Sequence, residues 1–250
     1  MERGFREAYS IGNLVERGNF LSFIFEGLQK AFQLIFSLNK EVFIIVLFSL
    51  KVSGIAIFLA SLSGVPLGFL IGVKNFRWKK FTVILLNNAL AIPTVVVGLI
   101  IYSFISRVGP LGYFGLLYTP TAVIIGQYFL ATPIIIALTH SAIQGIDTKV
   151  RHTALTLGST EIQAAWAVVK EGRYAIMSAI ITGFGRIIAE VGAAMMLGGN
   201  IKGSTRTMTT AISLETSKGE FGFGIALGII LLLISLSINV FLSYIQSKKL

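Results

Sequence analysis

The sequence has no cysteine and only two histidines, and these shortages exclude several classes of site. Without Cys among its 250 residues, the chain can form neither disulfides nor thiolate metal sites. His140 and His152 are too few for a histidine-rich metal centre, so no metal site is expected. The phosphate-binding pattern G-x-x-x-x-G-K-[ST] is also missing, and no paired His and Asp groups suggest catalysis. An enzyme is therefore disfavoured.

Charged residues are scarce as well. They make up 13% of the chain, against about 25% in a typical soluble domain. Hydrophobic residues reach 54% and the mean hydropathy is +0.82, which indicates an integral membrane protein. The 26 Gly against 5 Pro suit helices that pack closely in lipid. The net charge of +10 is explained by basic cytoplasmic loops, so no nucleic-acid partner is expected.

Long apolar segments predict the fold class. A membrane-spanning helix needs about 20 mostly apolar residues. The sequence predicts an all-α membrane protein with five transmembrane helices, or six if residues 20–38 also span. The five segments are approximately 42–73, 82–106, 119–140, 174–197 and 222–246.

The N-terminal segment, residues 1–40, is expected to be distinct from a transmembrane domain over 41–250. Apolar residues of the stretch 20–38 recur at helical spacing, while Glu26, Gln29, Lys30 and Gln33 cluster elsewhere on the helical wheel. This pattern favours an amphipathic helix lying in the lipid interface over a sixth span. The N-terminal residues show no apolar core followed by a small-residue cleavage site, so no signal peptide is expected.

Basic loops predict the orientation. Residues 74–80 and 141–173 are rich in Lys and Arg, and the chain ends in Lys248 and Lys249. These parts are expected on the cytoplasmic side, and the N-terminus outside.

The loop 141–173 carries strong helix-capping signals. Asp147 can cap a helix over Thr148–Leu157. Gly158 can take the left-handed conformation that ends this helix, and Thr160 with Gln163 forms a capping box for the next one. The sequence therefore predicts a helix–Gly–helix elbow.

The expected tip of this elbow is small and apolar. It comprises Ala154, Leu155, Leu157 and Gly158, with no partner evident within the loop. Docking into a groove of another protein and packing on the chain's own bundle are equally favoured by the spacing alone.

Three stretches resemble the permeases of type I ABC importers. "TALTLGSTEIQAAWAVV" is similar to their cytoplasmic signature loop, and "IPTVVVGLIIY" to their second core helix. "GFGRIIAEVGAAMMLGGNI" resembles the molybdate, sulfate and tungstate members, and the tungstate type is closest. The resemblance covers about residues 45–245. His152, Thr153 and Glu171 replace the Glu, first Ala and Pro of the signature, while its Gly is kept as Gly158.

The resemblance implies a homodimeric permease in a prokaryotic inner membrane, working with other subunits. Two ABC ATPase subunits would grip its cytoplasmic loops, and an extracytoplasmic binding protein would deliver the solute. ATP and Mg would be used by the ATPase, so this chain would bind no cofactor directly. Tungstate is the first substrate expected, molybdate the second and sulfate the third. The residues assigned to the ATPase-coupling loop are Asp147, His152, Ala154, Leu155, Leu157, Gly158 and Ser159.

Arg186 and Glu190 lie in the apolar stretch 174–197. A charge at the centre of a membrane helix costs roughly 2.5–3.5 kcal/mol. Because the two residues are four apart, they are expected to share one helix face and form an ion pair. The pair could fix helix packing or contribute to a gate, and both are favoured over direct contact with a dianion, which a carboxylate would repel.

Residues 198–213 combine turn glycines, many hydroxyls, Lys202 and Arg206. They suit an oxyanion site and a solvated docking loop equally. Pro93 and Thr94 can kink the second span because proline removes a helical hydrogen bond. The candidates for the pathway or gate are Arg186, Glu190, Asn88, Pro93, Thr94, Asn200, Thr205, Arg206 and Thr207.

An ion-coupled secondary transporter is the alternative of a different class. Such carriers usually show inverted repeats and carboxylates at the midplane. No repeat is apparent here, and Glu190 is the only acid in the middle of a span. An intramembrane enzyme or a purely structural scaffold ranks third.

Overall fold

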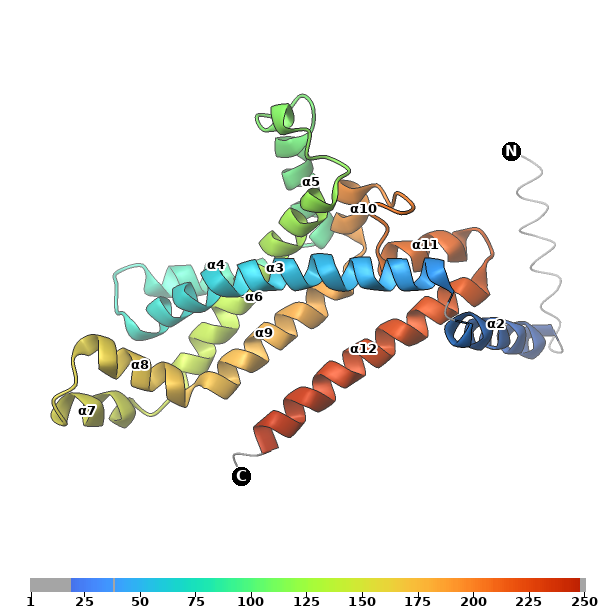
Figure 1. The fold of residues 1–250 in the computed structure, drawn as a ribbon. Helices are drawn as coiled ribbons and strands as arrows, with labels where there is room; N and C mark the ends of the chain where they lie inside the picture. The colour runs from blue at the N-terminus through green and yellow to red at the C-terminus, as the bar shows by residue number, and fades with distance from the viewer. Residues whose placement is uncertain (1–18, 38, 248–250) are drawn as a thin grey trace.

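The computed structural model describes residues 19–37 and 39–247, and within these ranges the chain contains helices and no strand (Figure 1). The all-α prediction is confirmed. Residues 1–18 and 38 of the N-terminal segment and the basic pair Lys248 and Lys249 lie outside the described residues. The elements are α2 (Asn19–Phe36), α3 (Lys40–Val73), α4 (Lys79–Ala91), α5 (Thr94–Ile105), the 3-10 turn η1 (Gly112–Phe114), α6 (Pro120–Gln144), α7 (Thr148–Thr156), α8 (Glu161–Glu171), α9 (Arg173–Ile188), α10 (Gly192–Gly198), α11 (Met208–Ser217) and α12 (Phe221–Ser247).

Three single helices, α3, α6 and α12, are long and apolar enough to cross a membrane. Two bent pairs, α4 with α5 and α9 with α10, bring the number to 5 if each pair is one span. The prediction of five spans is confirmed in this sense. α2 is a helix as expected but is not among the candidate spans, and its place in the lipid interface stays a prediction.

The centre of the bundle is the close pair α3 and α6. Gly64, Gly68 and Gly72 recur every fourth residue along α3. A Cβ atom at Gly68 would lie 2.6 Å from the carbonyl oxygen of Ile136, and one at Gly72 would lie 2.8 Å from the Ile143 side chain. Without side chains at these positions, the two backbones approach each other closely, as is common for helices in lipid.

The segment 82–106 differs from the single kinked span that the sequence predicts. It forms two helices, α4 and α5, whose axes meet at 99°. Ile92 and Pro93 are both extended, with ψ of 129° and 127°, so neither continues the helix. Proline lacks an N–H and pushes the preceding residue out of the helical region, which explains a complete break.

The segment 174–197 is also broken, where the sequence predicts one continuous helix. α9 ends at Ile188, α10 begins at Gly192, and their axes meet at 62°. Glu190 therefore lies in the break and not on a helix face shared with Arg186. No proline marks this position, and the break depends on polar contacts described below.

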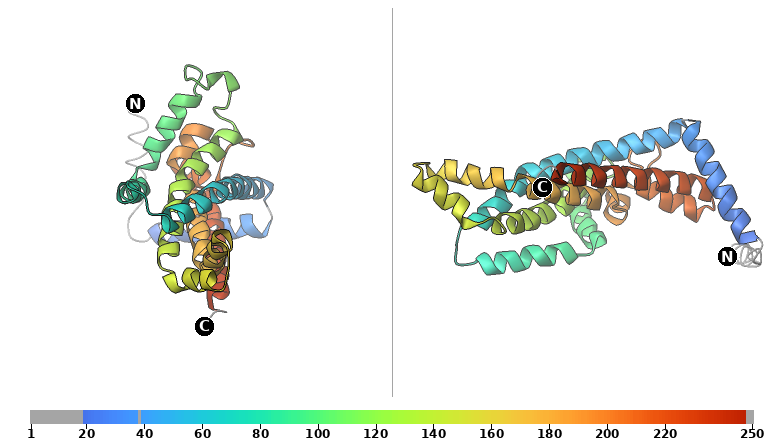
Figure 2. Two further views of the ribbon diagram at one scale, coloured as in Figure 1. Left: turned by 90° about the vertical axis from the view of Figure 1, so that its left-hand side faces the viewer. Right: turned by 90° about the horizontal axis from the view of Figure 1, so that it is seen from below.

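Two further elements lie at the end of the bundle where α3 begins (Figures 1 and 2). α2 packs on the start of α12, where Lys30 lies 2.8 Å from Glu220 and lowers the pKa of that exposed carboxyl. α11 fills part of the segment that was expected to be a loop. Thr207 and Thr210 cap its first turn reciprocally, a box built with threonine in place of the usual Glu or Gln.

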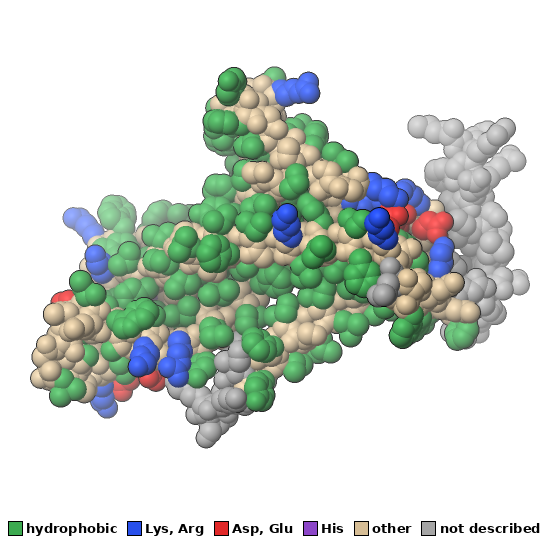
Figure 3. Space-filling view, viewed as in Figure 1, with side chains coloured by type: hydrophobic (Ala, Val, Ile, Leu, Met, Phe, Trp, Pro, Cys, Tyr) green, Lys and Arg blue, Asp and Glu red, His purple; other side chains and the backbone are tan. Residues whose placement is uncertain are grey.

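The surface matches a membrane environment. Hydrophobic side chains cover most of the face in Figure 3, and charged side chains gather mainly toward the ends of the molecule. Large apolar residues along the spans, such as Leu47, Phe58 and Leu232, are strongly exposed. Such extensive exposure is expected where lipid replaces water as the surrounding solvent.

Candidate functional site

The break between α9 and α10 is organised by the buried carboxylate of Glu190. Its Oε2 lies 3.1 Å from Nη1 of Arg186, so the predicted ion pair is present. Its Oε1 accepts a hydrogen bond of 3.1 Å from the N–H of Ala193 in the first turn of α10. The carboxylate thus connects the last turn of α9 to the first turn of α10.

Side chains from neighbouring helices satisfy the backbone at this break. Gln127 of α6 donates from Nε2 to the carbonyl of Ile187, 3.2 Å away. Thr209 of α11 donates to the carbonyl of Glu190 at 2.7 Å. Since no water is available in the hydrocarbon region, unpaired carbonyls there would cost several kcal/mol. These two side chains are buried, and sequence analysis did not single them out.

The break between α4 and α5 lies next to the break between α9 and α10. A Cβ atom on Gly192 would come within 2.6 Å of Val95 Cγ2, 3.4 Å of Glu190 Oε1 and 3.6 Å of Thr94 Oγ1. Gly192 therefore lets the start of α5 touch the start of α10. Two helix breaks, each a predicted candidate region, meet in the interior of the bundle.

A small cavity of about 20 Å³ lies at this meeting point. Its lining comes from α4, the turn after it, the start of α5, α6 and α9, and it comprises Ala89, Leu90, Ile92, Thr94, Leu130, Ile134, Arg186 and Ile187. A cavity needs roughly 10–15 Å³ to hold one water molecule. The space thus suits a water and not a tetrahedral oxyanion in the conformation described.

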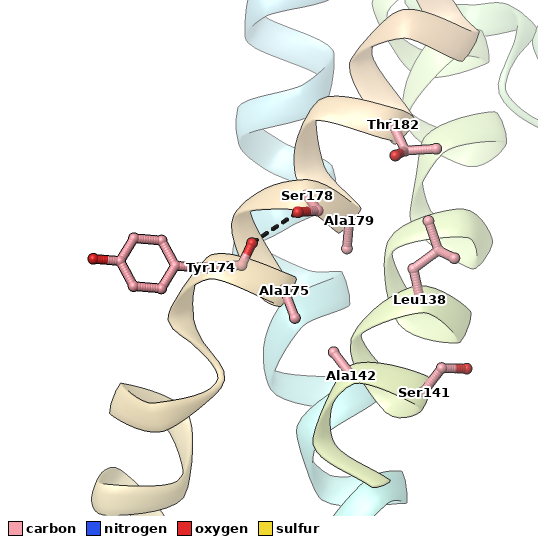
Figure 4. Close-up of a pocket in the computed structure, with 8 residues that line it drawn as sticks. All are labelled: Leu138, Ser141, Ala142, Tyr174, Ala175, Ser178, Ala179 and Thr182. Carbon is pink, nitrogen blue, oxygen red and sulfur yellow. Dashed lines mark hydrogen bonds between the residues drawn. The ribbon is translucent and has the colours of Figure 1, made fainter. Parts of the chain in front are cut away.

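A much larger groove of about 600 Å³ follows α6 and α9 (Figure 4). Ala175 and Ala179 of α9 face Leu138 and Ala142 of α6 across it, and Thr182 lies at one end in the view. Small side chains therefore make its floor. A second hollow of about 550 Å³ shares Ser141, Ala142, Tyr174 and Ala175 and continues to Asp147 of the elbow.

The groove and the small cavity lie along one stripe of α9. Ala175, Thr182 and Arg186 are separated by seven and four residues, which places them on the same helix face. The stripe connects the elbow to the ion pair. Sequence analysis did not find the groove, because it depends on how α6 and α9 pack.

The elbow has the predicted local structure. Asp147 accepts a hydrogen bond from the N–H of Lys149 and caps α7. Gly158 has φ of +87°, and the N–H groups of Gly158 and Ser159 donate to the carbonyls of Leu155 and Ala154 at 3.0 and 3.1 Å. This is the Schellman pattern. The capping box of Thr160 and Gln163 is confirmed too.

The exposed apolar surface of the elbow differs from the predicted one. Leu157 is 81% exposed as expected, but Ala154 and Leu155 are half-buried. Ile162 and Trp166 of α8, 83% and 68% exposed, extend the surface instead. Their spacing of four residues in a polar loop was a signal that could have revealed them. His152 is exposed on α7.

The predicted pathway residues between 198 and 207 use their polar side chains in hydrogen bonds within the protein. Thr205 donates to the carbonyl of Gly198 and accepts from the N–H of Ile201, while Asn200 donates to the carbonyl of Thr210. Thr207 caps α11. These side chains are largely buried, whereas residues 201–204 between them are exposed. Their part in a pathway stays a prediction.

Arg206 is buried between two carboxylates. Its side chain is 10% exposed, and Nη1 lies 3.5 Å from Glu215 and 3.8 Å from Glu41. Lys202 also contacts Glu41, at 2.7 Å. The basic residues Lys202 and Arg206, which were candidates to attract an oxyanion, are therefore paired with the carboxylates of Glu41 and Glu215. Asn88, in contrast, is exposed on α4, which has no fully buried residue.

Known proteins match this chain along most of its length. The family of binding-protein-dependent transport system inner membrane components matches residues 64–250. The tungstate uptake system permease protein TupB of Campylobacter jejuni is 44% identical over 90% of this chain and 95% of its own. TupB of Peptoclostridium acidaminophilum is 38% identical over 91% of this chain and 100% of its own.

A solved structure shows the same fold. It is that of a bacterial ABC transporter involved in the import of alginate, with a TM-score of 0.66 and 18% identity, covering 98% of this chain and 94% of that one. The chain belongs to the family of binding-protein-dependent transport system inner membrane components. The resemblance found in the sequence to type I ABC importer permeases is confirmed.

Breaking the Arg186–Glu190 pair should destabilise the protein more when one partner is removed than when both are. Arg186→Met leaves the buried Glu190 carboxylate without its countercharge, and the cost should lie below the about 3–5 kcal/mol typical of a fully buried pair because the Arg186 side chain is 47% exposed. Arg186→Met with Glu190→Gln leaves no charge behind, keeps an acceptor for the N–H of Ala193 and should unfold at a higher temperature than either single variant. The measurement is thermal unfolding in detergent. Single variants that unfold at the wild-type temperature would show that the pair contributes nothing.

Proposed function

We propose that this chain is the membrane-spanning subunit of an ATP-driven ABC importer for a tetrahedral oxyanion, tungstate before molybdate and sulfate. The observation that carries the proposal is the 44% identity to a tungstate uptake permease over 90% of this chain. The second such permease, at 38% identity, supports the same substrate. This chain then provides the pathway, and ATP with Mg is used by a separate ATPase subunit.

The geometry is compatible with a pathway through the bundle. Two broken helices meet in the interior, as they do at the substrate sites of other transporters. Gln127 and Thr209 satisfy the backbone there without blocking the groove along α6 and α9. A second copy of the chain, packed on the exposed faces of α4 and α5, would close the pathway from the other side.

The elbow is the proposed docking site for the ATPase. Its two caps and the Schellman turn fix its shape, and Leu157, Ile162 and Trp166 present apolar surface outward. Buried Val168 and Ile176 attach it to the bundle in one cluster with Ile143. Two such elbows, one in each copy, would engage two ATPase subunits in the cytoplasm, and a binding protein would dock on the opposite side.

A secondary transporter is less consistent with the structure. Ion coupling needs a carboxylate that can exchange its ion during transport. Both oxygens of Glu190 are engaged, one by Arg186 and the other by the N–H of Ala193. Glu190 thus has its own countercharge in Arg186, and its Oε1 stays held at the break by the N–H of Ala193 even when Arg186 turns away.

Gly158→Ala should weaken binding of the ATPase subunit. No atom lies within 4 Å of an added Cβ, so the effect arises only from the positive φ. A left-handed conformation costs roughly 1–2 kcal/mol for most residues, while asparagine tolerates it better. We expect Gly158→Ala to reduce recovery of the ATPase in a pull-down and Gly158→Asn to retain more of it. Equal recovery with all three proteins would place the docking site elsewhere.

Single cysteines should report the orientation, since the chain has no native Cys. Asn75 and Tyr113 are exposed and lie in the loops on either side of the pair α4 and α5. An impermeant thiol reagent should label Asn75→Cys only from the cytoplasm and Tyr113→Cys only from outside. The reverse pattern would contradict the orientation and the placement of the elbow against a cytoplasmic ATPase.

The substrate is tested by ATPase stimulation in a complex reconstituted with its binding protein. Tungstate-loaded binding protein should stimulate hydrolysis and drive uptake more strongly than molybdate or sulfate at equal concentration. The binding protein without an oxyanion is the matched control. Equal stimulation with and without oxyanion, and no uptake of any of the three, would refute the proposed function.

A further inference from the structure

The two members of the buried ion pair have very different environments. Glu190 is 3% exposed, whereas the Arg186 side chain is 47% exposed. The pair is therefore not a closed unit in the core. The carboxylate belongs to the interior, and the guanidinium extends toward the surface of α9 that carries the groove.

Most of the hydrogen-bonding capacity of Arg186 is unused. A guanidinium has five N–H donors. The structure assigns one hydrogen bond to them within the described residues, from Nη1 to Glu190. Arginine forks bind tetrahedral oxyanions through two parallel N–H groups, and the free edge of Arg186 can offer such a fork.

The groove ends one helical turn from Arg186. Thr182 lines the groove and lies one helical turn before Arg186 on the same face of α9. Arg186 lines the small cavity beyond, which holds about 20 Å³ and admits no oxyanion. An anion at the Thr182 end of the groove of about 600 Å³ would therefore lie within one helical turn of Arg186.

The Glu190 carboxylate can stay in place when Arg186 turns to bind another anion. Its Oε1 stays bound to the N–H of Ala193, so the carboxylate remains held when the guanidinium turns. The repulsion between this carboxylate and a dianion is reduced because Arg186 lies between Glu190 and the groove. The contact would thus be weak, as a transport pathway requires for release.

We propose that Arg186 is an oxyanion-binding residue inside the membrane, which engages a tetrahedral dianion at the Thr182 end of the α6–α9 groove. This inference rests on the proposed function and adds the side chain that contacts the substrate. Arg186 exchanges between Glu190 and the transported ion, so the ion pair gates the cavity at the two helix breaks.

Thiol labelling at two positions of the groove tests the proposal without transport. Thr182→Cys places a thiol about 6 Å along the helix from Arg186, and Ala175→Cys is the matched control at about 16 Å. Both positions are exposed and face the groove. In the permease–ATPase complex in nanodiscs, millimolar tungstate should slow labelling of Thr182→Cys by a neutral reagent at least about threefold. Ala175→Cys should be affected less.

The role of Arg186 is isolated by repeating the measurement with Arg186→Met and Glu190→Gln together, which removes both charges and leaves an amide oxygen at position 190 to accept from the N–H of Ala193. Protection of Thr182→Cys should disappear, and tungstate uptake should fall about tenfold while the complex still assembles. Arg186→Lys keeps the positive charge but loses the two parallel N–H donors of the guanidinium. Its uptake should lie between that of the wild type and that of the double variant. Protection that persists in the double variant would overturn the proposal, and so would uptake within twofold of wild type.

The outcomes separate the two proposals. A wild-type complex that imports tungstate but shows no protection at Thr182→Cys refutes the Arg186 site and leaves the function intact. A complex that imports no oxyanion refutes the function, and the Arg186 site with it. Protection by sulfate equal to that by tungstate would support the site and place selectivity elsewhere, in the binding protein.

Discussion

The structure depends on one constraint, that backbone groups inside a bilayer must find partners within the protein. Two spans of this chain are broken, and each break frees N–H and carbonyl groups far from water. At the break between α9 and α10, Glu190 binds the first turn of α10, Gln127 binds the end of α9 and Thr209 binds Glu190 itself. Polar residues from α6, from α11 and from the break itself thus make a break possible in the middle of an apolar bundle.

The same helix that carries this break also connects it to the elbow. α8 and α9 join at Gly172, where a Cβ atom would lie 2.8 Å from the Ile146 side chain. α9 then runs without interruption from Arg173 to Ile188, with Arg186 in its last turn. α3 and α6, packed closely along the glycine stripe, form the scaffold on which α9 lies. Movement of the elbow would therefore be passed to the ion pair by a rigid element.

Local signals in the sequence predicted local structure well. The caps at Asp147 and Thr160 and the left-handed Gly158 each depend on a few adjacent residues, and the structure confirms them. At Pro93 the sequence predicted a kink, and the structure has a complete break. The break at Glu190 was missed because its partners, Gln127 and Thr209, are distant in the chain. Burial of Arg206 between Glu41 and Glu215 was missed for the same reason. The pairing of Arg186 with Glu190 was predicted, but their unequal exposure was not, since it depends on the packing of α6 against α9.

The central claim is that Glu190 closes a broken span by bridging Arg186 and the N–H of Ala193. A cryo-EM map of the assembled complex in lipid nanodiscs tests it most directly, at a resolution that defines side chains. The account predicts that the chain leaves the helix between Ile188 and Gly192, with the Glu190 carboxylate within hydrogen-bonding distance of both groups. A continuous helix through these residues, with Glu190 turned away from Arg186, would contradict it.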